Sequence, residues 1–400
     1  MSAANRLSSM VRNMAESETL KMAQMARNLR AQGHDVISLA IGEPDFDTPE
    51  HIKKAAVKAL KEGFTKYTPV PGTPDLLEAI SKKFSRDNKL DYAPNQIIVS
   101  NGAKQSISNV AFALLEKGDE CIIFAPYWVS YIEIVRMTGA TPVIVSAGVD
   151  QGYKVTAKQV KAAITPRTKM VLFSSPCNPS GAVFTKAELK KIADEIGKHP
   201  NIIIVSDEIY EYINYTKGNT SIGTFESVKN QTVTVNGFAK GFAMTGWRLG
   251  YIGAPKWIAD ACNKIQGQYT SGANSFSQKA GAVALNSSLK TTYKMRDEFR
   301  KRRDMCIELM AQIPGFIVPV PDGAFYIFPD ISAYFGKTDG KTVVNNADDF
   351  ADYVMLNAFV GVVSGGAFGS PTCFRLSYAA SEAQLREAIR RIAEVCAKLK

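Results

Sequence analysis

A lysine in an apolar setting is the first residue of this chain that could do covalent chemistry. Lys240 lies in residues 235–251 among glycine, alanine and phenylalanine residues, and Arg248 follows eight positions later. Apolar surroundings disfavour the charged form of a lysine, so its amine becomes a better nucleophile. A guanidinium can bind a phosphate through two hydrogen bonds. The pair predicts an aldehyde cofactor held on Lys240 as a Schiff base, with its phosphate near Arg248; the alternative is an ordinary surface lysine.

Three polar residues could serve the ring of such a cofactor. Asp207 follows an apolar run, where a carboxylate is costly unless it meets a cation such as a protonated pyridine nitrogen. Its alternative role is a helix cap. Tyr210 and Asn178 can each bond a phenolate oxygen, and Asn178 lies between two prolines, where a cis bond could set its direction.

Three further positions could bind a phosphate, a ring or a carboxylate. The small residues in 101–106 let backbone N–H groups approach a phosphate at a helix start, although a plain strand-to-helix turn has the same pattern. Trp128 can lie flat on an aromatic ring or belong to the core. Arg375 interrupts an apolar strand, where its guanidinium matches a substrate carboxylate or forms a structural ion pair.

The elements that must position these residues form a regular alternation of strands and helices. Six short β-branched runs are predicted strands: residues 97–100, 121–124, 143–145, 170–173, 202–205 and 233–235. They lack polar alternation, which predicts burial of both faces in a mostly parallel sheet covered by helices. Ligands of such sheets bind beyond the carboxyl ends of the strands, and every cluster described above follows such an end.

Helical spacing and capping residues complete the predicted architecture. Helices are expected at residues 18–32, 49–62, 73–88 and 105–116, with Thr48 as the cap of the second and Pro49 at its first position. A long amphipathic stretch covers residues 275–313. The last quarter predicts a smaller α+β unit, with strands at 324–328, 360–363 and 374–378 and helices at 348–357 and 382–400.

Composition excludes several classes of protein. The 400 residues are 46% hydrophobic and 22% charged, with a net charge of +10 that is not gathered into a basic stripe, so we expect no nucleic-acid partner. No apolar run is long enough for a membrane span or a signal peptide, so we expect no membrane association. Six scattered cysteines and three histidines make a metal site improbable and favour a reducing, cytoplasmic location.

Seven motifs, in order, give the chain a family resemblance. They read G-E-P-D-F-D-T-P, S-N-G-A-K-Q, A-P-Y-W-V-S-Y, N-P-S-G, S-D-E-I-Y-E, A-K-G-F-A-M-T-G-W-R-L-G-Y and F-R-L-S-Y-A. The chain resembles the class I, fold-type I aminotransferases that use pyridoxal 5'-phosphate, specifically the bacterial and plant aspartate aminotransferases related to prephenate aminotransferases. The resemblance runs from residue 37 to the C-terminal helix. It implies an α/β fold with a mostly parallel seven-stranded sheet between helices, plus a smaller α+β domain.

The resemblance also implies roles for individual residues. Lys240 would form the Schiff base and carry the proton between the substrate Cα and the cofactor, and Asp207 would hold the pyridine nitrogen. The other cofactor contacts follow from matching motif positions: Asn178 and Tyr210 at the phenolic oxygen, Trp128 against the ring, and Gly102, Ala103, Lys104 and Arg248 around the phosphate. Tyr67 matches a tyrosine that reaches the neighbouring subunit's phosphate, which implies a homodimer with shared active sites.

Substrate contacts are implied in the same way. The amino-acid end of the substrate would meet Gly42, Trp128, Asn178 and Arg375, and the candidates for its distal carboxylate are Lys104, Ser17 and Thr19. Two departures stand out: Gly237 replaces a serine or threonine that bonds the phosphate in many relatives, and Ala15-Glu16 replaces a basic residue and a proline. The second departure bears more on prephenate than on aspartate.

From this we expect three segments and one activity. Residues 1–48 would form an N-terminal arm and part of the small domain, residues 49–300 the large cofactor domain, and residues 301–400 the C-terminal small domain. The expected reaction is a ping-pong transamination of L-aspartate with 2-oxoglutarate. The alternatives are a prephenate, aromatic or alanine aminotransferase, or a lyase, on the same fold. A regulator is disfavoured because only about 35 residues, too few for a DNA-binding module, precede the first predicted strand, a short apolar run at residues 36–41.

Overall fold

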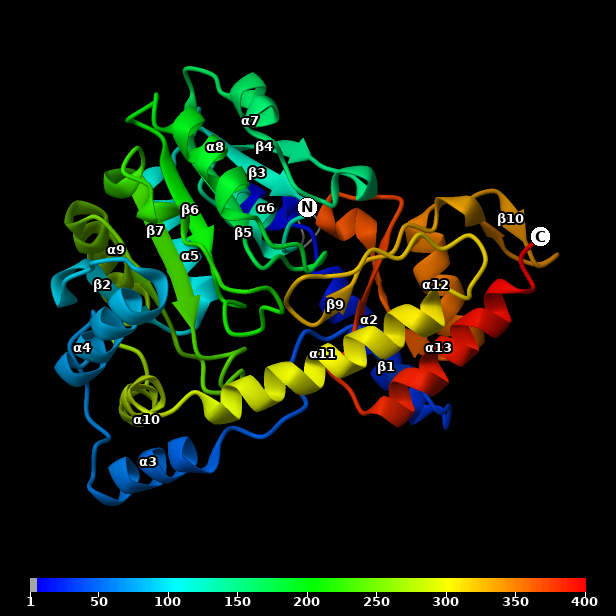
Figure 1. The fold of residues 1–400 in the computed structure, drawn as a ribbon, viewed down its shortest axis with the longest axis horizontal. Coiled ribbons are helices and arrows are strands. Elements are labelled where there is room, and N and C mark those ends of the chain that lie inside the picture. The colour runs from blue at the N-terminus through cyan, green and yellow to red at the C-terminus, as the bar shows by residue number, and fades with distance from the viewer. Residues whose placement is uncertain (1–5) are drawn as a thin grey trace.

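A seven-stranded sheet forms the centre of the molecule in the computed structural model, which describes residues 6–400 (Figure 1). Its strand order is β2-β8-β7-β6-β5-β3-β4. The strands are β2 (Ile97–Ser100), β3 (Glu120–Ala125), β4 (Thr141–Ser146), β5 (Thr168–Ser174), β6 (Ile203–Asp207), β7 (Thr232–Gly237) and β8 (Gly250–Gly253). The six predicted runs are confirmed as strands. The seventh, β8, was missed because its Gly-Tyr-Ile-Gly sequence carries little strand signal.

The sheet is parallel except at β8, which pairs antiparallel with both β2 and β7. The register places Ser174 opposite Asp207 and Asp207 opposite Val235, so β5, β6 and β7 end side by side. This alignment brings the chain segments that follow these strands to one edge of the sheet.

Helices cover both faces of the sheet, because successive side chains of a strand point to opposite sides. Cys121 and Ile123 of β3 pack toward α5 (Ala103–Leu114), α6 (Ser130–Met137) and α9 (Lys256–Tyr269). Ile122 and Phe124 pack toward α7 (Ala157–Ala163) and α8 (Lys186–Ile196). The predicted burial of both faces is wrong for β4, an edge strand in which Ile144 is 37% exposed.

Three predicted helices differ in detail. Helix α3 (Glu50–Lys61) begins after Pro49, which is itself the capping position, and the Thr48 hydroxyl instead donates a hydrogen bond of 2.6 Å to the Ala243 carbonyl. The stretch 73–88 is α4 (Pro74–Lys83) followed by a π-helical turn, η2 (Phe84–Asn88). The stretch 275–313 is two helices, α10 (Ser275–Asn286) and α11 (Lys290–Met310), rather than one.

A smaller α+β unit lies beside the large sheet, as the last quarter of the sequence predicts (Figure 1). A three-stranded sheet of order β13-β14-β9 joins Val363–Ser364, Phe374–Ser377 and Tyr326–Ile327, and it packs with α12 (Ala347–Ala358) and α13 (Glu382–Cys396). Strand β1 (Ile37–Ser38) pairs in parallel with β12 (Val360–Gly361), and α2 (Glu18–Ala31) contributes to a neighbouring apolar cluster. The N-terminal segment therefore belongs structurally with the end of the chain.

The remaining elements are short. They are α1 (Ser9–Asn13), β10 (Lys337–Thr338), which pairs antiparallel with β11 (Val343–Val344), and single turns of 3-10 helix. Within residues 6–400, no helix is both long and apolar enough to cross a membrane, and no cluster of three or more histidine, cysteine or acidic residues could hold a metal. All six cysteines are free and buried.

Candidate active site

A cavity of about 410 Å³ lies at the carboxyl ends of the parallel strands. Of the site residues predicted from the sequence, all but one line it: Ser17, Thr19, Gly42, Gly102, Ala103, Lys104, Trp128, Asn178, Asp207, Tyr210, Lys240, Arg248 and Arg375. The exception is Tyr67, which is 99% exposed and does not reach the cavity of its own chain. Ala15 and Glu16 are exposed and do not contribute to its walls.

Lys240 follows β7 and directs its amine into this cavity. Its Nζ donates a hydrogen bond of 2.5 Å to the Gly42 carbonyl and lies 5.7 Å from the ring centres of Tyr210 and Phe325. Burial, reinforced by the positive charge of Arg375, lowers the pKa of Lys240 to about 8. At pH 7 about a tenth of this amine is therefore uncharged and able to attack a carbonyl carbon, far more than for an ordinary lysine.

Asp207 is the last residue of β6 and is held at both carboxylate oxygens. The Tyr131 hydroxyl donates to Oδ2 at 2.6 Å, and the backbone N–H of Ile209 donates to Oδ1 at 3.2 Å. Burial raises the pKa of Asp207 to about 6 in spite of these bonds, so a cation placed beside it would be stabilised strongly. The contact with Tyr131, in the first turn of α6, was not predicted, since no local pattern links the two residues.

An anion site lies where α5 begins. Gly102 precedes the helix with φ +88° and offers no side-chain cap, so the first backbone N–H groups of α5 face the cavity. Arg248 crosses over this turn, with Nη1 3.0 Å from the Thr245 carbonyl oxygen. A Cβ on Gly102 would overlap the Arg248 guanidinium. The combination of free N–H groups, the helix dipole and a guanidinium suits a phosphate.

Lys104, in the first turn of α5, and Trp128 also line the cavity. The Lys104 Nζ lies 5.0 Å from the centre of the Trp128 ring, and burial together with the charge of Arg248 lowers the pKa of Lys104. Ser17, the capping position of α2, makes no capping bond with its side chain. An ammonium and a hydroxyl that makes no capping bond are thus available in the lining of the cavity.

Arg375 is a buried cation without a counter-charge. Only 2% of the residue is exposed, its Nη1 donates to Asn178 Oδ1 at 2.9 Å, and its Nη2 donates to the Ala40 carbonyl. The rings of Tyr326 and Phe368 lie 4.6 and 4.8 Å from its Cζ. In the described part of the chain no carboxylate pairs with it and its Nε has no partner, so the alternative of a structural ion pair is wrong. The guanidinium is free to take a ligand carboxylate.

Tyr326 is a second residue that was not predicted. Its hydroxyl lies 2.7 Å from the Tyr210 hydroxyl, and a Cβ on Gly42 would overlap that same oxygen. Gly42 therefore lets the N-terminal loop approach both Lys240 and Tyr326. The strand carrying Tyr326 lies in the smaller unit, and 116 residues separate it from Tyr210, so no local pattern predicts the contact.

Gly237, where the sequence departs from the family pattern, is crowded. A Cβ there would lie 3.0 Å from Gly250 Cα, Ile209 Cδ1 and the Leu249 carbonyl oxygen. The close approach of β7 and β8 accounts for glycine at this position.

The residues present fit pyridoxal phosphate. An aldehyde would meet the amine of Lys240, a pyridine nitrogen the carboxylate of Asp207, and a phosphate the N-terminus of α5 with Arg248. These three functional groups share one cavity whose size suits a molecule of that class.

Comparisons with known proteins agree with this geometry. Residues 34–392 match the family model described as aminotransferase class I and II. A bifunctional aspartate aminotransferase and glutamate/aspartate-prephenate aminotransferase from Petunia hybrida is 44% identical over 98% of this chain and 83% of its own length. A probable aspartate/prephenate aminotransferase from Rhizobium leguminosarum is 45% identical over 96% of this chain and 97% of its own.

Solved structures show the same similarity in three dimensions. The crystal structure of the aspartate aminotransferase from Rhizobium meliloti superimposes with a TM-score of 0.96 at 41% identity, covering 99% of this chain and 100% of that one. The aspartate aminotransferase from Thermus thermophilus, solved with maleate, gives a TM-score of 0.92 at 40% identity, covering 97% and 99%. On its motifs, its fold and these matches, the chain belongs to the class I and II aminotransferases, and it is a pyridoxal-phosphate-dependent aminotransferase of fold type I.

Proposed function

We propose that this enzyme is an aspartate aminotransferase, which transfers the amino group of L-aspartate to 2-oxoglutarate in two half-reactions. The observation that carries the proposal is the unpaired, buried guanidinium of Arg375 in the same cavity as the Lys240 amine. An amino acid presents its α-carboxylate and its Cα a fixed distance apart, so a cation and a base in one cavity suit it. Relatives named as aspartate aminotransferases, and one solved with the dicarboxylate maleate, support the substrate class.

Lys240 and Asp207 have distinct roles in the proposed reaction. When bound, pyridoxal phosphate supplies an electron sink that lowers the barrier to removing the substrate Cα proton. Lys240 takes that proton and returns it, which suits an amine whose pKa is about 8. Asp207 keeps a proton on the pyridine nitrogen, and Tyr131 and the Ile209 N–H hold its carboxylate in place.

The two carboxylates of an acidic substrate would be bound at opposite ends of the cavity. Arg375 binds the α-carboxylate and Lys104 the distal one, with Ser17 and Thr19 beside it. The Asn178 side chain, which already accepts a hydrogen bond from Arg375, orients that guanidinium. The Trp128 ring forms the wall against which the cofactor ring lies.

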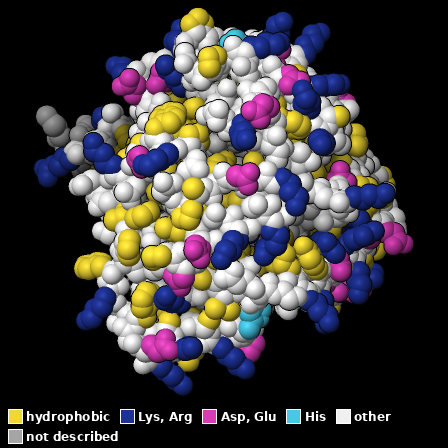
Figure 2. Space-filling model, turned by 60° about the vertical axis from the view of Figure 1, so that its left-hand side comes forward, with side chains coloured by type: hydrophobic (Ala, Val, Ile, Leu, Met, Phe, Trp, Pro, Cys, Tyr) yellow, Lys and Arg dark blue, Asp and Glu magenta, His cyan; other side chains and the backbone are white. Residues whose placement is uncertain are grey.

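A homodimer with shared active sites is part of the proposal. Tyr67 is 99% exposed, so its side chain is available to contact a second subunit. An open groove of about 830 Å³ beside the cavity exposes apolar residues that include Val57 and Leu60. Exposed apolar grooves of this kind are typical of protein interfaces. Hydrophobic side chains emerge between dispersed charges on the face drawn in Figure 2, where Lys and Arg form no continuous stripe.

We also propose the division into an N-terminal segment of residues 1–48, a large domain of 49–300 and a small domain of 301–400, supported by the pairing of β1 with β12. Six free, buried cysteines support a cytoplasmic location.

A panel of amino donors tests the proposed activity. With 2-oxoglutarate as acceptor, L-aspartate should give the highest kcat/KM among aspartate, alanine and phenylalanine, with oxo-acid and no free ammonia released. A higher value for another donor, or release of ammonia, would reject the assignment. Lys240→Ala, the control for the cavity, should lose turnover by about 10⁴-fold or more because both nucleophile and proton carrier are gone.

Prephenate is the second candidate acceptor because several relatives are named for it. The same panel, run with L-aspartate or L-glutamate as donor and prephenate as acceptor, decides this point. Since the residues at 15 and 16 are an alanine and an acid, both exposed, we expect prephenate to be a poorer acceptor than 2-oxoglutarate.

A further inference from the structure

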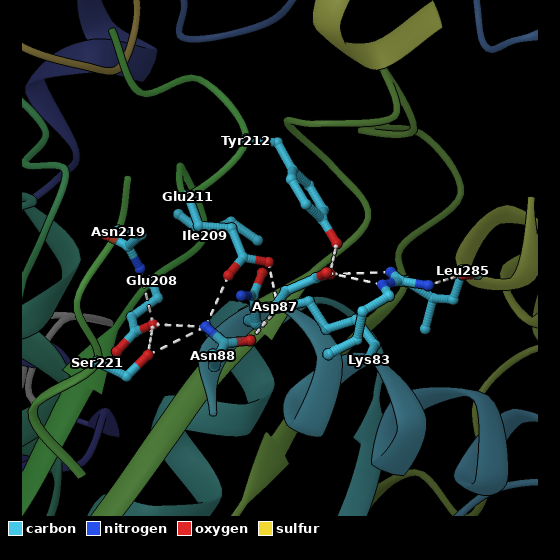
Figure 3. Close-up of polar contacts among 12 residues, drawn as sticks. Lys83, Asp87, Asn88, Glu208, Ile209, Glu211, Tyr212, Asn219, Ser221 and Leu285 are labelled. Carbon is cyan, nitrogen blue, oxygen red and sulfur yellow. Dashed lines mark hydrogen bonds and ion pairs between the residues drawn. The ribbon is translucent and has the colours of Figure 1, made fainter. Parts of the chain in front are cut away.

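A second cluster of buried charges involves Glu208 and Glu211, which follow Asp207 in the chain (Figure 3). Lys83, Asn88, Glu208 and Glu211 are all at least nine-tenths buried, and none of them lines the reaction cavity. Lys83 and Asn88 come from α4 and the π-helical turn η2, whereas Glu208 and Glu211 follow β6. Burying two carboxylates and an ammonium costs free energy, so the cluster is expected to have a structural or functional role that offsets this cost.

Asn88 is the hub of this cluster. Its Nδ2 lies 3.0 Å from Glu208 Oε2 and 2.8 Å from Glu211 Oε2, and its Oδ1 accepts a hydrogen bond from the Lys83 ammonium. Because an ammonium can only donate, the amide oxygen must face Lys83 and the NH₂ group must face the carboxylates. One amide therefore joins both acids to the base, and Lys83 also forms an ion pair with Glu211.

Glu208 is bound by more donors than Asn88 alone. The Ser221 hydroxyl donates to it at 2.6 Å, the Asn219 amide at 3.1 Å and the Ser206 hydroxyl at 3.1 Å. Its carboxylate is thus fixed from several directions, and so is the backbone that carries it.

The cluster and the cavity share one short segment of backbone. Asp207 and Tyr210 line the cavity, while Glu208 and Glu211, each one residue further along, enter the cluster. The backbone N–H of Glu211 bonds the Glu208 carbonyl at 2.9 Å, which ties the two acids into the same turn. A shift of this turn would therefore move Asp207 and Tyr210 together.

The next residue extends the same support toward Lys240. The Tyr212 hydroxyl donates to Asp87 Oδ2 at 2.6 Å, and its ring lies 5.5 Å from that of Phe242. A Cβ on Gly241, the residue after Lys240, would come within 2.7 Å of the Tyr212 ring. Turn η2 thus contacts Glu208, next to Asp207, and is linked to Gly241, next to Lys240, through Tyr212.

We propose that Asn88 is a positioning residue of the active site, which holds the turn carrying Asp207 and Tyr210 at its cofactor-binding geometry through Glu208 and Glu211. The predicted effect of Asn88 on cofactor binding rests on the proposed role of Asp207. The predicted effect of Asn88 on the turn does not depend on that role.

The experiment compares two matched substitutions in the full-length chain. Asn88→Leu removes the amide that joins the two acids to Lys83, and Asn109→Leu is the control. Both asparagines are 4% exposed. In the described part of the chain, Asn109 donates to the Gln266 side chain at 3.0 Å and makes no hydrogen bond to the Asp207 turn. Hydrogen exchange of residues 207–213 is followed by mass spectrometry, and the Kd for pyridoxal phosphate is obtained by absorbance titration. Asn88→Leu should speed exchange in this segment and raise that Kd, each about tenfold, since each of the two buried acids loses one donor and the link between them is removed.

The control should leave exchange in residues 207–213 and the Kd near the wild-type values. If Asn88→Leu matches Asn109→Leu in both measurements, the proposal is wrong. Should Asn88→Leu not fold, Ser221→Ala takes its place, because it removes only one 2.6 Å bond to Glu208; about threefold faster exchange in the segment is expected, and unchanged exchange overturns the proposal.

Asp207→Asn in the same titration separates this inference from the proposed function. An unchanged Kd for Asp207→Asn would reject the proposed role of Asp207. Exchange in residues 207–213 would still decide whether Asn88 holds the turn.

Discussion

Two lysines in neighbouring parts of this molecule have opposite surroundings. Lys83 is fully buried, pairs with Glu211 and donates to Asn88. Lys240 donates to a backbone carbonyl in a cavity, and within the described residues no carboxylate is close enough to form an ion pair with it. Both ammonium groups lie near aromatic rings, at 5.4 Å for Lys83 and 5.7 Å for Lys240.

The difference shows that a buried lysine can stabilise the fold through an ion pair or can supply a reactive amine. A lysine whose charge is matched by a carboxylate joins the elements that carry the two residues, as Lys83 of α4 and Glu211 after β6 do here. A lysine that is desolvated without an anion beside it has a lowered pKa, so its amine can be uncharged in the folded protein. The same contrast applies to the acids, since Glu211 has a lysine partner and Asp207 has only neutral donors.

The largest expected effect is a loss of stability when the ion pair of Lys83 is removed. Lys83→Met should lower the free energy of unfolding by about 3–5 kcal/mol, because Glu211 would remain buried without its cation. Urea denaturation of the cofactor-free protein measures this. Lys240→Met should cause no comparable loss, as its ammonium has no ion-pair partner.

A double substitution sharpens the result. Lys83→Met combined with Glu211→Leu removes both charges and should recover a large part of the stability, since apolar pairs often replace buried ion pairs at little cost. Equal losses in Lys83→Met and Lys240→Met would contradict the distinction between the two lysines.

The second effect concerns Asp207, whose folded-state pKa is raised from 3.8 to about 6. The folded protein binds more protons than the unfolded chain between these values, so stability falls as the pH rises through this window. Asp207→Asn should therefore stabilise the cofactor-free protein by at most roughly 3 kcal/mol at pH 8, and by less at pH 5. Thermal unfolding at several pH values tests this, and a gain independent of pH would refute it.

The third effect concerns the phosphate site. Gly102→Ala introduces a Cβ at φ +88° that overlaps Arg248, so the affinity for pyridoxal phosphate should fall by about tenfold. Gly118→Ala is the matched control, since it has φ +104° and no neighbour within 4 Å of its added Cβ. Backbone strain alone would lower stability in both variants, whereas only Gly102→Ala should weaken cofactor binding.

The smallest effect is a shift of pH dependence at Lys240. Since its pKa is about 8, the rate of pyridoxal-phosphate capture by the cofactor-free protein should rise with pH and level off above pH 8. Arg375→Gln should move this midpoint upward, because the positive charge of Arg375 helps to lower the pKa. Stopped-flow absorbance gives the profile; a midpoint near the ordinary lysine value of 10.5 would show that burial has no such effect.

Much of the fold was predictable because it is encoded locally. Six β-branched runs identified strands, and glycine and proline marked the turns between them. β8 was missed because only Ile252 of its four residues is β-branched and two are glycines. The stretch 275–313 was read as continuous because Ser287, Ser288 and Leu289 do not forbid a helix. The Thr48 cap failed because that hydroxyl bonds a carbonyl 195 residues away.

The sequence predicted which residues belong to the site better than it predicted their hydrogen-bond partners. Residues at the carboxyl ends of successive strands had to gather at one edge, and thirteen of fourteen predicted site residues line one cavity. Tyr131 and Tyr326 were missed since an aromatic residue in a helix or strand gives no sign of the partner that its hydroxyl will find.

By itself the sequence determined which residues can react and which short segments carry them, because apolar runs, small residues and isolated charges act on their immediate neighbours. The tertiary structure alone decided which charges are paired. Tyr131 bonds Asp207 across 76 residues and Arg375 bonds Asn178 across 197, while Lys83 finds Glu211 and Lys240 finds no acid. Burial strengthens electrostatic interactions and removes water as an alternative partner, so the pKa values on which the chemistry depends exist only once the chain is folded.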